Sequence, residues 1–278
     1  DINCLIGDIS PDFSPDYIMF LIKKFYPETF DYIDKSNNVV HDKDWHFIKS
    51  NNSSLVMNLP STFPVKFTNH GHQDITSFVW NYNGKNVVLD PGRKSYSNDK
   101  DSIFQRSLNA HNVLNIDGVG AVSEYFLNSG WIPRPYSFVN SKVVVNDKKV
   151  CITTNGFDRK SKKLKYKRII EICKNGIKII DEVIGSTEHE LVLTWNINER
   201  YTVKNINNKS VIFNSKSDNE TLIMTCSCDS TKLNIQEKIG HRSPSYDELL
   251  EYSKIEIMGK VKLPVKIITK FEVTKCVE

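Results

Sequence analysis

The sequence predicts a mainly β protein, an antiparallel and supersandwich-like β-sandwich with a short helical segment at its N-terminal end. Three observations lead to this prediction. Apolar and polar residues alternate in many short runs, turn-forming pairs such as Asn83-Gly84 separate the runs, and no long helical pattern interrupts them. Short strands joined by tight turns are typical of antiparallel sandwiches rather than of parallel sheets.

The N-terminal part, residues 1–48, is expected to be helical and linking in character. Ser14 is suited to cap a helix. Pro15 is suited to the first position of that helix, because the N–H that proline lacks has no partner within the helix at that position. The following residues are too densely apolar for a surface helix, so we expect this helix to pack on something.

Residues 49–278 are expected to form the sandwich domain, and hairpin signals recur along them. Asn83-Gly84 is a favoured type I′ turn pair between two alternating runs. Further turns are predicted at Asn146-Asp147 and Asn175-Gly176, and residues 243–252 fit either a short helix or a loop. Further strands are expected in the segments ELVLTWNI, YTVKNI, SVIFNS, TLIMTCS and VKIITKFEV.

Composition excludes several classes of function. The net charge of +4 is spread without a polybasic arm, so nucleic acid is not an expected partner. The longest apolar run, Tyr17 to Ile22, is too short to span a membrane. Six cysteines occur without a Cys-x-x-Cys pair, which argues against a cysteine-based zinc site and favours buried free thiols. No signal peptide is visible, although the chain begins with Asp rather than Met.

The residues that suggest chemistry lie between positions 70 and 111. His70 and His72 flank Gly71, Asp90 follows a strand that the predicted hairpin returns beside them, and His111 precedes another strand. Two imidazoles and a carboxylate are a plausible ligand set for Zn²⁺, with a fourth position for water or another ligand. The alternative, in which these are hydrogen-bonded polar residues at strand ends, remains open at about even weight.

Five separate elements in the same region match a known family in order and spacing. The region resembles the heparinase II/III-like polysaccharide lyases, and similar stretches occur near Ile6, around Arg168 and Asp181, and near residue 245, where Asp247 stands in place of the usual Gly. The matching elements are His70-Gly71-His72-Gln73-Asp74, Asp90-Pro91-Gly92, Tyr96, Arg106-Ser107 and Ala110-His111-Asn112.

The resemblance implies an α/α toroid domain before the sandwich, with this chain as the end of the toroid plus the sandwich. It implies β-elimination on an anionic polysaccharide that contains uronic acid, such as a glycosaminoglycan, by a bacterial enzyme that is periplasmic or secreted. In that scheme His70 contacts the reacting sugar as the catalytic residue, and His72, Asp90 and His111 hold a metal, Zn²⁺ by preference, with Ca²⁺ or another divalent ion as alternatives.

Other side chains are assigned to sugar contacts on weaker grounds. The resemblance suggests Tyr96, Arg106 and Asn112 near the cleft. Trp131 and Arg134 lie together in a loop rich in Gly and Pro, where they could contact an anionic sugar. The strand residues Trp80 and Trp195 are expected in the core instead, and the lysine run 158–168 is expected to be a solvated sheet edge, with a heparin-like contact as the minor alternative.

Three functional hypotheses follow. The first is a lyase of the kind described, complete only with its N-terminal toroid. The second is a non-catalytic glycan-binding or assembly module that retains the metal site. The third is a hydrolytic zinc enzyme in which the metal activates water, with Asp74 as the candidate base.

Overall fold

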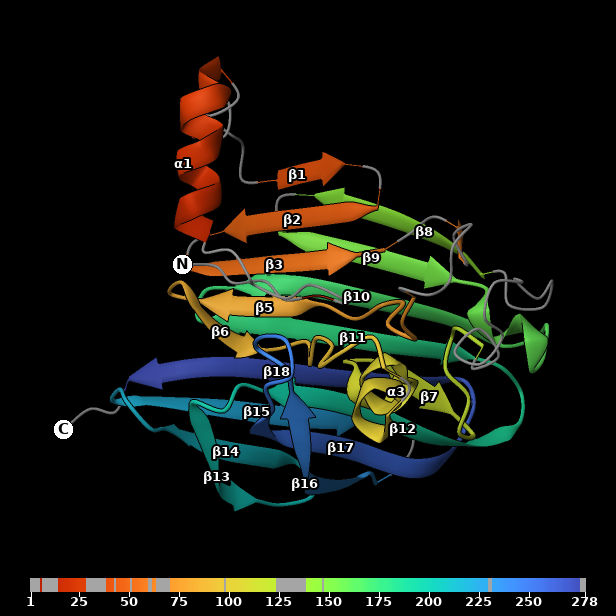
Figure 1. Cartoon of the computed structure of the whole chain (residues 1–278). Coiled ribbons are helices and arrows are strands. Elements are labelled where there is room, and N and C mark those ends of the chain that lie inside the picture. Colours follow the sequence, from red (N-terminus) through yellow and green to blue (C-terminus); the bar gives the residue numbers. More distant parts are fainter. Residues whose placement is uncertain are drawn as a thin grey trace.

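Two antiparallel β-sheets packed face to face form the body of the computed structural model (Figure 1). The structure describes residues 6, 15–28, 39–42, 44–50, 52–59, 62–63, 71–97, 99–123, 139–146, 148–229 and 232–275. The predicted sandwich is therefore confirmed. Of the described helices, none is long and apolar enough to cross a bilayer.

The first sheet has nine strands, and the short β7 joins it by pairing with β12. In spatial order its strands are β1 (Val39–Asp42), β2 (Trp45–Ser50), β3 (Ser53–Asn58), β5 (Val79–Tyr82), β6 (Lys85–Val88), β12 (Glu188–Ile197), β17 (Leu250–Lys262) and β16 (Asn234–Arg242), with β7 (Leu114–Ile116) beside β12. β1 and β2 pair in this sheet although they lie before or across residue 48, so the division of the chain at that residue stays a prediction.

The second sheet also has nine strands, and its edges are β13 and β4. In spatial order its strands are β13 (Tyr201–Ile206), β14 (Ser210–Ser215), β15 (Glu220–Cys228), β18 (Val265–Lys275), β11 (Gly176–Ile184), β10 (Lys165–Cys173), β9 (Lys149–Thr154), β8 (Val139–Asn146) and β4 (Thr62–Phe63).

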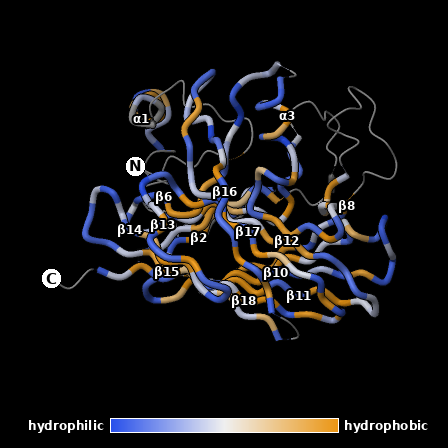
Figure 2. Tube along the Cα trace, turned by 90° about the horizontal axis from the view of Figure 1, so that it is seen from below, coloured by the Kyte–Doolittle hydropathy of each residue, from blue (hydrophilic) through white to orange (hydrophobic). Residues whose placement is uncertain are grey.

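The core lies between the two sheets, where their inward side chains meet. Burial alternates along β18, as expected for a strand with one face on the core and one toward solvent. Trp80 and Trp195 are fully buried, as predicted, and both rings contact Phe271 of the opposite sheet, with centroid distances of 6.1 and 5.6 Å. Figure 2 shows hydrophobic residues gathered along the strands and hydrophilic ones in the connections.

The helices in the described ranges are short. They include α1 (Pro15–Phe25), α3 (Lys100–Arg106) and the 3₁₀ turns η1 (Leu108–Ala110) and η3 (Gly156–Arg159). α1 begins at Pro15 as predicted, but it stands off the edge of the first sheet (Figure 1), and Phe20 and Phe25 are more than half exposed. The expectation that this helix packs on something is therefore not met within the described part of the chain.

The structure decides two local predictions. Residues 243–249 form a loop, which was one of the two predicted alternatives, and Asp247 adopts the left-handed conformation (φ 58°) that glycine favours and that Asp tolerates. The lysine run 158–168 is not a sheet edge, because β10, which begins at Lys165, pairs with β9 on one side and β11 on the other.

Candidate functional site

The candidate site is built from connections of the first sheet. The segment before β5 contains His72 and Asp74, Asp90 follows β6, and His111 directly follows η1. α3 and η1 lie on the outer face of this sheet, since Lys254 of β17 donates to the carbonyl of Asn109. Residues far apart in the sequence are thus placed around one point.

The hairpin between β5 and β6 fixes the position of Asp90. Asn83 and Gly84 both have positive φ angles, 51° and 72°, as a type I′ turn requires, so the predicted turn is confirmed. Leu89 then donates to Asn196 of β12, which continues the pairing to the edge of the site. Gly92, with φ 67°, turns back so that its N–H donates to Oδ1 of Asp90.

Three of the predicted side chains form one buried chain of contacts. Nδ1 of His111 lies 2.8 Å from Oδ2 of Asp90, and Nε2 of His111 lies 3.3 Å from Nδ1 of His72. A carboxylate can only accept, so the proton between His111 and Asp90 belongs to Nδ1 of the imidazole. In the neutral ring, Nε2 is then left as a lone pair that faces His72.

The electrostatics of the cluster separate two carboxylates. Burial by itself would raise the pKa of Asp90, but the adjacent His111 outweighs it and lowers that pKa. Burial would likewise lower the pKa of His111, and the charge and hydrogen bond of Asp90 raise it instead. For Asp74, burial dominates and raises the pKa despite attraction to His111 and His72. Asp90 is therefore the carboxylate that stays ionised, and Asp74 is the one that holds a proton more tightly.

The imidazole nitrogens fit a tetrahedral metal in their spacing. Two nitrogens bound to one Zn²⁺ at ~2.0–2.1 Å lie roughly 3.3–3.4 Å apart, and the pair from His72 and His111 is 3.3 Å apart. Asp90, predicted as a third ligand, lies at the other nitrogen of His111, in the place of a carboxylate that orients a metal-binding ring, and its role as a ligand stays a prediction. Within the described ranges, no three His, Cys, Asp or Glu side chains form a ready metal group.

Arg106 and Gln73 hold the His72 segment against α3. Arg106 is buried, and its Nε donates to the carbonyl of Gly71 while its own carbonyl accepts from the N–H of Gln73. The side chain of Gln73 bonds to the backbone of Leu108 and Val122. Arg106 thus lies beside the site, where it positions backbone, and its predicted contact with substrate stays a prediction.

Asn112 is a structural link rather than part of an open surface. It is fully buried, and its Nδ2 donates to the carbonyls of Phe78 and Leu89 while its Oδ1 accepts from the N–H of Asn196. Its amide therefore joins three segments around the site and presents no exposed atom to a sugar. The resemblance suggested Asn112 either for contact in the cleft or for support behind it, and this burial argues against the direct contact and fits the supporting role.

The remaining predicted residues lie apart from the cluster or outside the described residues. Tyr96 is 59% exposed, with the guanidinium of Arg93 over its ring at 4.6 Å, so its contact with substrate stays a prediction. His70, Trp131 and Arg134 fall outside the described residues.

Sequence reasoning missed two neighbours of the cluster. Asp74 was considered only as a base for hydrolysis, yet its interactions with both imidazoles and with Asp90 place it in the group. Tyr252 of β17 is buried beside Asp90, and its hydroxyl has no hydrogen-bond partner within the described structure. Tyr252 lies on the same face of β17 as Lys254, away from the core between the sheets, and alternation along the strand does not reveal which loop covers that face.

Comparison with known proteins agrees with this architecture. The family model described as "Heparinase II/III-like, C-terminal" matches residues 34–273. The chain is similar to the heparan sulfate lyase HepC from Pedobacter heparinus, with 15% identity, a TM-score of 0.75, and 99% of this chain and 44% of that chain covered. A crystal structure of heparinase III gives 15% identity, a TM-score of 0.75, and coverage of 98% and 44%. No curated protein matches the sequence.

These likenesses differ in what they establish. At 15% identity, the solved structures support the fold alone, whereas the family model covers most of the chain. The chain spans less than half the length of the lyase structures that it matches.

Proposed function

Because the chain belongs to the heparinase II/III-like family, whose C-terminal domain it carries, we propose that it is the β-sandwich portion of a polysaccharide lyase. The substrate would be an anionic polysaccharide containing uronic acid, cleaved by β-elimination. The observation that carries the proposal is the buried convergence of His72, His111 and Asp90, with Asp74 close by, from segments that are remote in sequence.

The proposed reaction is an elimination across two adjacent carbons of the uronate ring. A base removes the proton at C5, the bond from C4 to the leaving oxygen breaks, a double bond forms between C4 and C5, and an acid protonates the leaving oxygen. The barrier falls when donors or positive charge neutralise the uronate carboxylate, because the intermediate is enolate-like. An imidazole cluster with one ionised and one more basic carboxylate suits both charge stabilisation and proton transfer.

The residues divide these tasks as follows. His70 is proposed to contact the reacting sugar. His72 and His111 would hold a divalent cation, Zn²⁺ by donor chemistry, and Asp90 would fix the orientation of His111. When bound, the cation would supply positive charge and would stiffen the loops that carry the two histidines.

The proposed partner is an N-terminal α/α toroid domain, which would provide the tyrosine that acts on the C5 proton or the leaving oxygen. The short coverage of the lyase structures supports this proposal, since a larger part of those chains lies outside the matched region. The exposed aromatic rings of α1 offer an apolar surface of the kind that packs against another domain. We place the complete protein in the periplasm or outside the cell, where such polysaccharides occur.

Lyase activity is tested on the full gene product with heparan sulfate, hyaluronan, alginate and bacterial capsule. The expected result is an increase in the ultraviolet absorbance of the unsaturated uronate on at least one polymer. His111→Ala should remove it, whereas His241→Ala, a change at an exposed histidine on β16, should leave it intact. Binding without turnover on every polymer would favour the glycan-binding module instead.

The metal assignment is tested by zinc content and affinity, independently of activity. The double variant His72→Ala/His111→Ala should lose bound zinc. Asp90→Asn should keep the site but weaken zinc binding by roughly 10–100-fold, as expected for a carboxylate that orients a ligand. Complete loss in Asp90→Asn would show that the carboxylate is itself a ligand, and stoichiometric zinc in the double variant would contradict the assignment.

A further inference from the structure

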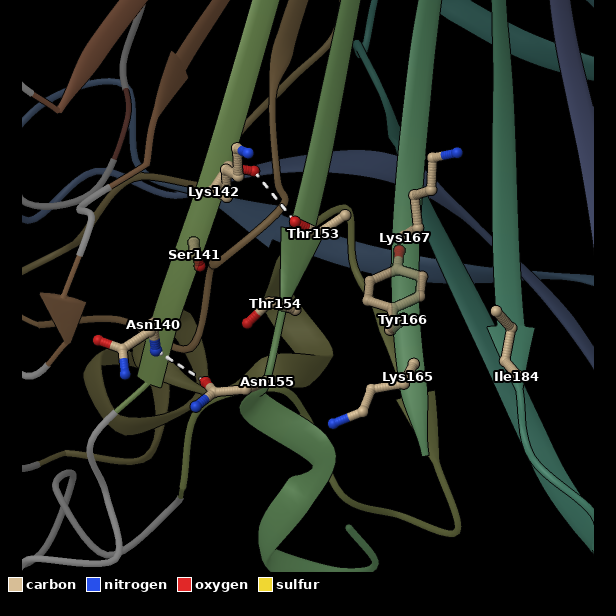
Figure 3. Close-up of a pocket in the computed structure, with 10 residues that line it drawn as sticks. All are labelled: Asn140, Ser141, Lys142, Thr153, Thr154, Asn155, Lys165, Tyr166, Lys167 and Ile184. Atoms are coloured by element: carbon tan, nitrogen blue, oxygen red, sulfur yellow. Dashed lines mark hydrogen bonds between the residues drawn. The ribbon is translucent and has the colours of Figure 1, made fainter. Parts of the chain in front are cut away.

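A hollow lies on the outer face of the second sheet, away from the cluster around His111. Its volume is about 440 Å³, within the range of roughly 300–1,000 Å³ that small-ligand sites occupy. Figure 3 shows Lys142 on β8 and Lys165 and Lys167 on β10, on either side of β9. The lining consists of Asn140, Ser141, Lys142, Thr153, Thr154, Asn155, Lys165, Tyr166, Lys167 and Ile184.

The strand register puts the three lysines on one face. Lys142 lies opposite Thr153 across β8 and β9, and Lys167 also pairs with Thr153 from the other side. The intervening residues, such as Tyr166, point inward and are buried. The hollow therefore belongs to the solvent face of the second sheet, whereas α3 and η1 cover the outer face of the first.

The charge around the hollow is positive. The ammonium of Lys165 lies 3.0 Å from Asp158, and that of Lys167 lies 3.5 Å from Glu182. Both are exposed surface pairs, which hold their partners weakly and exchange readily for another anion. For Lys142, the described structure shows no ion pair with its ammonium, so at least one cation faces the hollow without a carboxylate.

The rim and floor suit a sugar chain. The Oδ1 of Asn155 accepts from the backbone N–H of Asn140, and the side-chain NH₂ of Asn155 remains as a donor at the rim. The hydroxyl of Thr153 adds a further polar group, and Ile184, which is 56% exposed, offers an apolar surface for the C–H face of a ring. Lysine stems also present apolar walls below their charged ends.

We propose that this hollow is an accessory binding site for an anionic polysaccharide chain, which it holds at the face opposite the candidate active site. The proposal rests on the proposed function for the class of ligand. It also gives a role to the lysines at the end of the 158–168 run, because β10 brings Lys165 and Lys167 across from Lys142. A long chain bound at both sites would gain affinity through effective concentration, while a short fragment would not.

The test compares two variants of equal charge in the full gene product. The hollow variant is Lys142→Gln/Lys165→Gln/Lys167→Gln. The control is Lys204→Gln/Lys209→Gln/Lys216→Gln, on and beside the β13–β14 hairpin at the other end of the same sheet. The probes are long heparan sulfate chains, short heparan sulfate oligosaccharides and neutral dextran, with binding measured at several salt concentrations.

The expected result is that the hollow variant binds long chains about tenfold more weakly and with a shallower salt dependence, as fewer ionic contacts form. The control variant should bind long chains as tightly as the wild type does. Both variants should turn over short oligosaccharides at the wild-type rate. Equal binding by the hollow and control variants, or equal affinity of wild type for dextran, would overturn the proposal. His111→Ala separates the two proposals, since it should abolish turnover and retain the contribution of the hollow to binding.

Discussion

Asp117 shows how a single carboxylate can secure a turn. It follows β7 with φ 50°, and Gly118 continues the turn with φ 75°. Its Oδ1 accepts from the N–H of Glu190, and its Oδ2 accepts from Nδ1 of His189 and lies 2.8 Å from Nζ of Lys160. Burial alone would raise the pKa of Asp117, but these donors outweigh it and lower the pKa to about 2.

This shift predicts how the stability contributed by Asp117 depends on pH. A carboxyl whose folded pKa is depressed stabilises the protein above its unfolded pKa of about 3.9, and the contribution disappears as the pH falls toward about 2. Since the side chain is 31% exposed, we expect Asp117→Asn to cost about 1 kcal/mol at pH 7. The difference from wild type should shrink between pH 5 and pH 3 in urea unfolding. A difference that is unchanged over this interval would contradict the prediction.

At the same scale, the sequence could predict which residues meet but not how each is used. The hairpin argument correctly brought Asp90 toward the histidines, because an Asn-Gly turn fixes the register of the two strands. Spacing could not show that Asp90 contacts Nδ1 of His111. It also could not show that the side-chain amide of Asn112 forms hydrogen bonds with backbone groups. Those features depend on side-chain orientation and on loops that approach from other parts of the chain.

At the scale of elements, β10 and β11 connect the second sheet to the candidate site. Arg168 of β10 is fully buried and donates to Asp181 of β11, and it also donates to the carbonyls of Thr76 and Asn112. Thr76 has φ 79°, which is strained for a β-branched residue. The guanidinium therefore holds two segments that flank His72 and His111, and it stabilises a backbone conformation that would otherwise be unfavourable.

Removing the guanidinium should destabilise the protein strongly. We expect Arg168→Met to cost about 3–5 kcal/mol because it leaves the buried Asp181 carboxylate without its cationic partner, although the Tyr166 hydroxyl still donates to it. Arg168→Met/Asp181→Asn should recover part of this loss, since the uncompensated charge is then gone. Denaturant unfolding of the two single variants and the double variant gives the coupling energy. Additive effects of the two changes would show that the pair does not act as a unit.

Two glycines illustrate different reasons for the same residue type. Gly84 has φ 72° in the β5–β6 turn, with open space around it. Gly176 was predicted as part of a turn, but it pairs with Cys173, so the turn is Lys174-Asn175 and Gly176 is the first residue of β11. A Cβ at Gly176 would lie 1.8 Å from the carbonyl oxygen of Phe271. The Asn175-Gly176 pair correctly predicted a hairpin, but the position of Gly176 within it reflects the close approach of β18.

Substitution should separate these two roles. Gly84→Ala is expected to cost about 1–2 kcal/mol, the strain of one left-handed residue. Gly176→Ala is expected to cost about 3 kcal/mol or more, because β18 must move away from β11 to admit the methyl group. Thermal or urea unfolding of the two variants measures both values. Equal costs would indicate that β18 can move away from Gly176 without loss of stability, so that the close approach of the two strands does not require glycine.

At the scale of the whole molecule, alternation predicted two-faced strands and hence a sandwich, but it could not assign strands to sheets. Each apolar face can pair with any other apolar face of similar length. After β11 the chain crosses to the first sheet for β12 and returns to the second for β13 to β15. These crossings depend on the packing of the complete core, and they bring Trp80 and Trp195 from the first sheet onto Phe271 of the second.

This shared aromatic contact makes Phe271 a test of whether the two sheets unfold together. Phe271 is fully buried, so Phe271→Ala should cost about 3–5 kcal/mol through lost burial and the cavity left behind. Because the rings of both tryptophans touch it, their fluorescence and the circular dichroism of the strands should show one common, lowered midpoint in denaturant. The matched control is Phe20→Ala, at a ring that is 54% exposed on α1, with an expected change within about 0.5 kcal/mol. Two separate transitions in Phe271→Ala would mean that each sheet is stable without the other, and the joint support of the site by Arg168 from one sheet and by the hairpin from the other would then have to be abandoned.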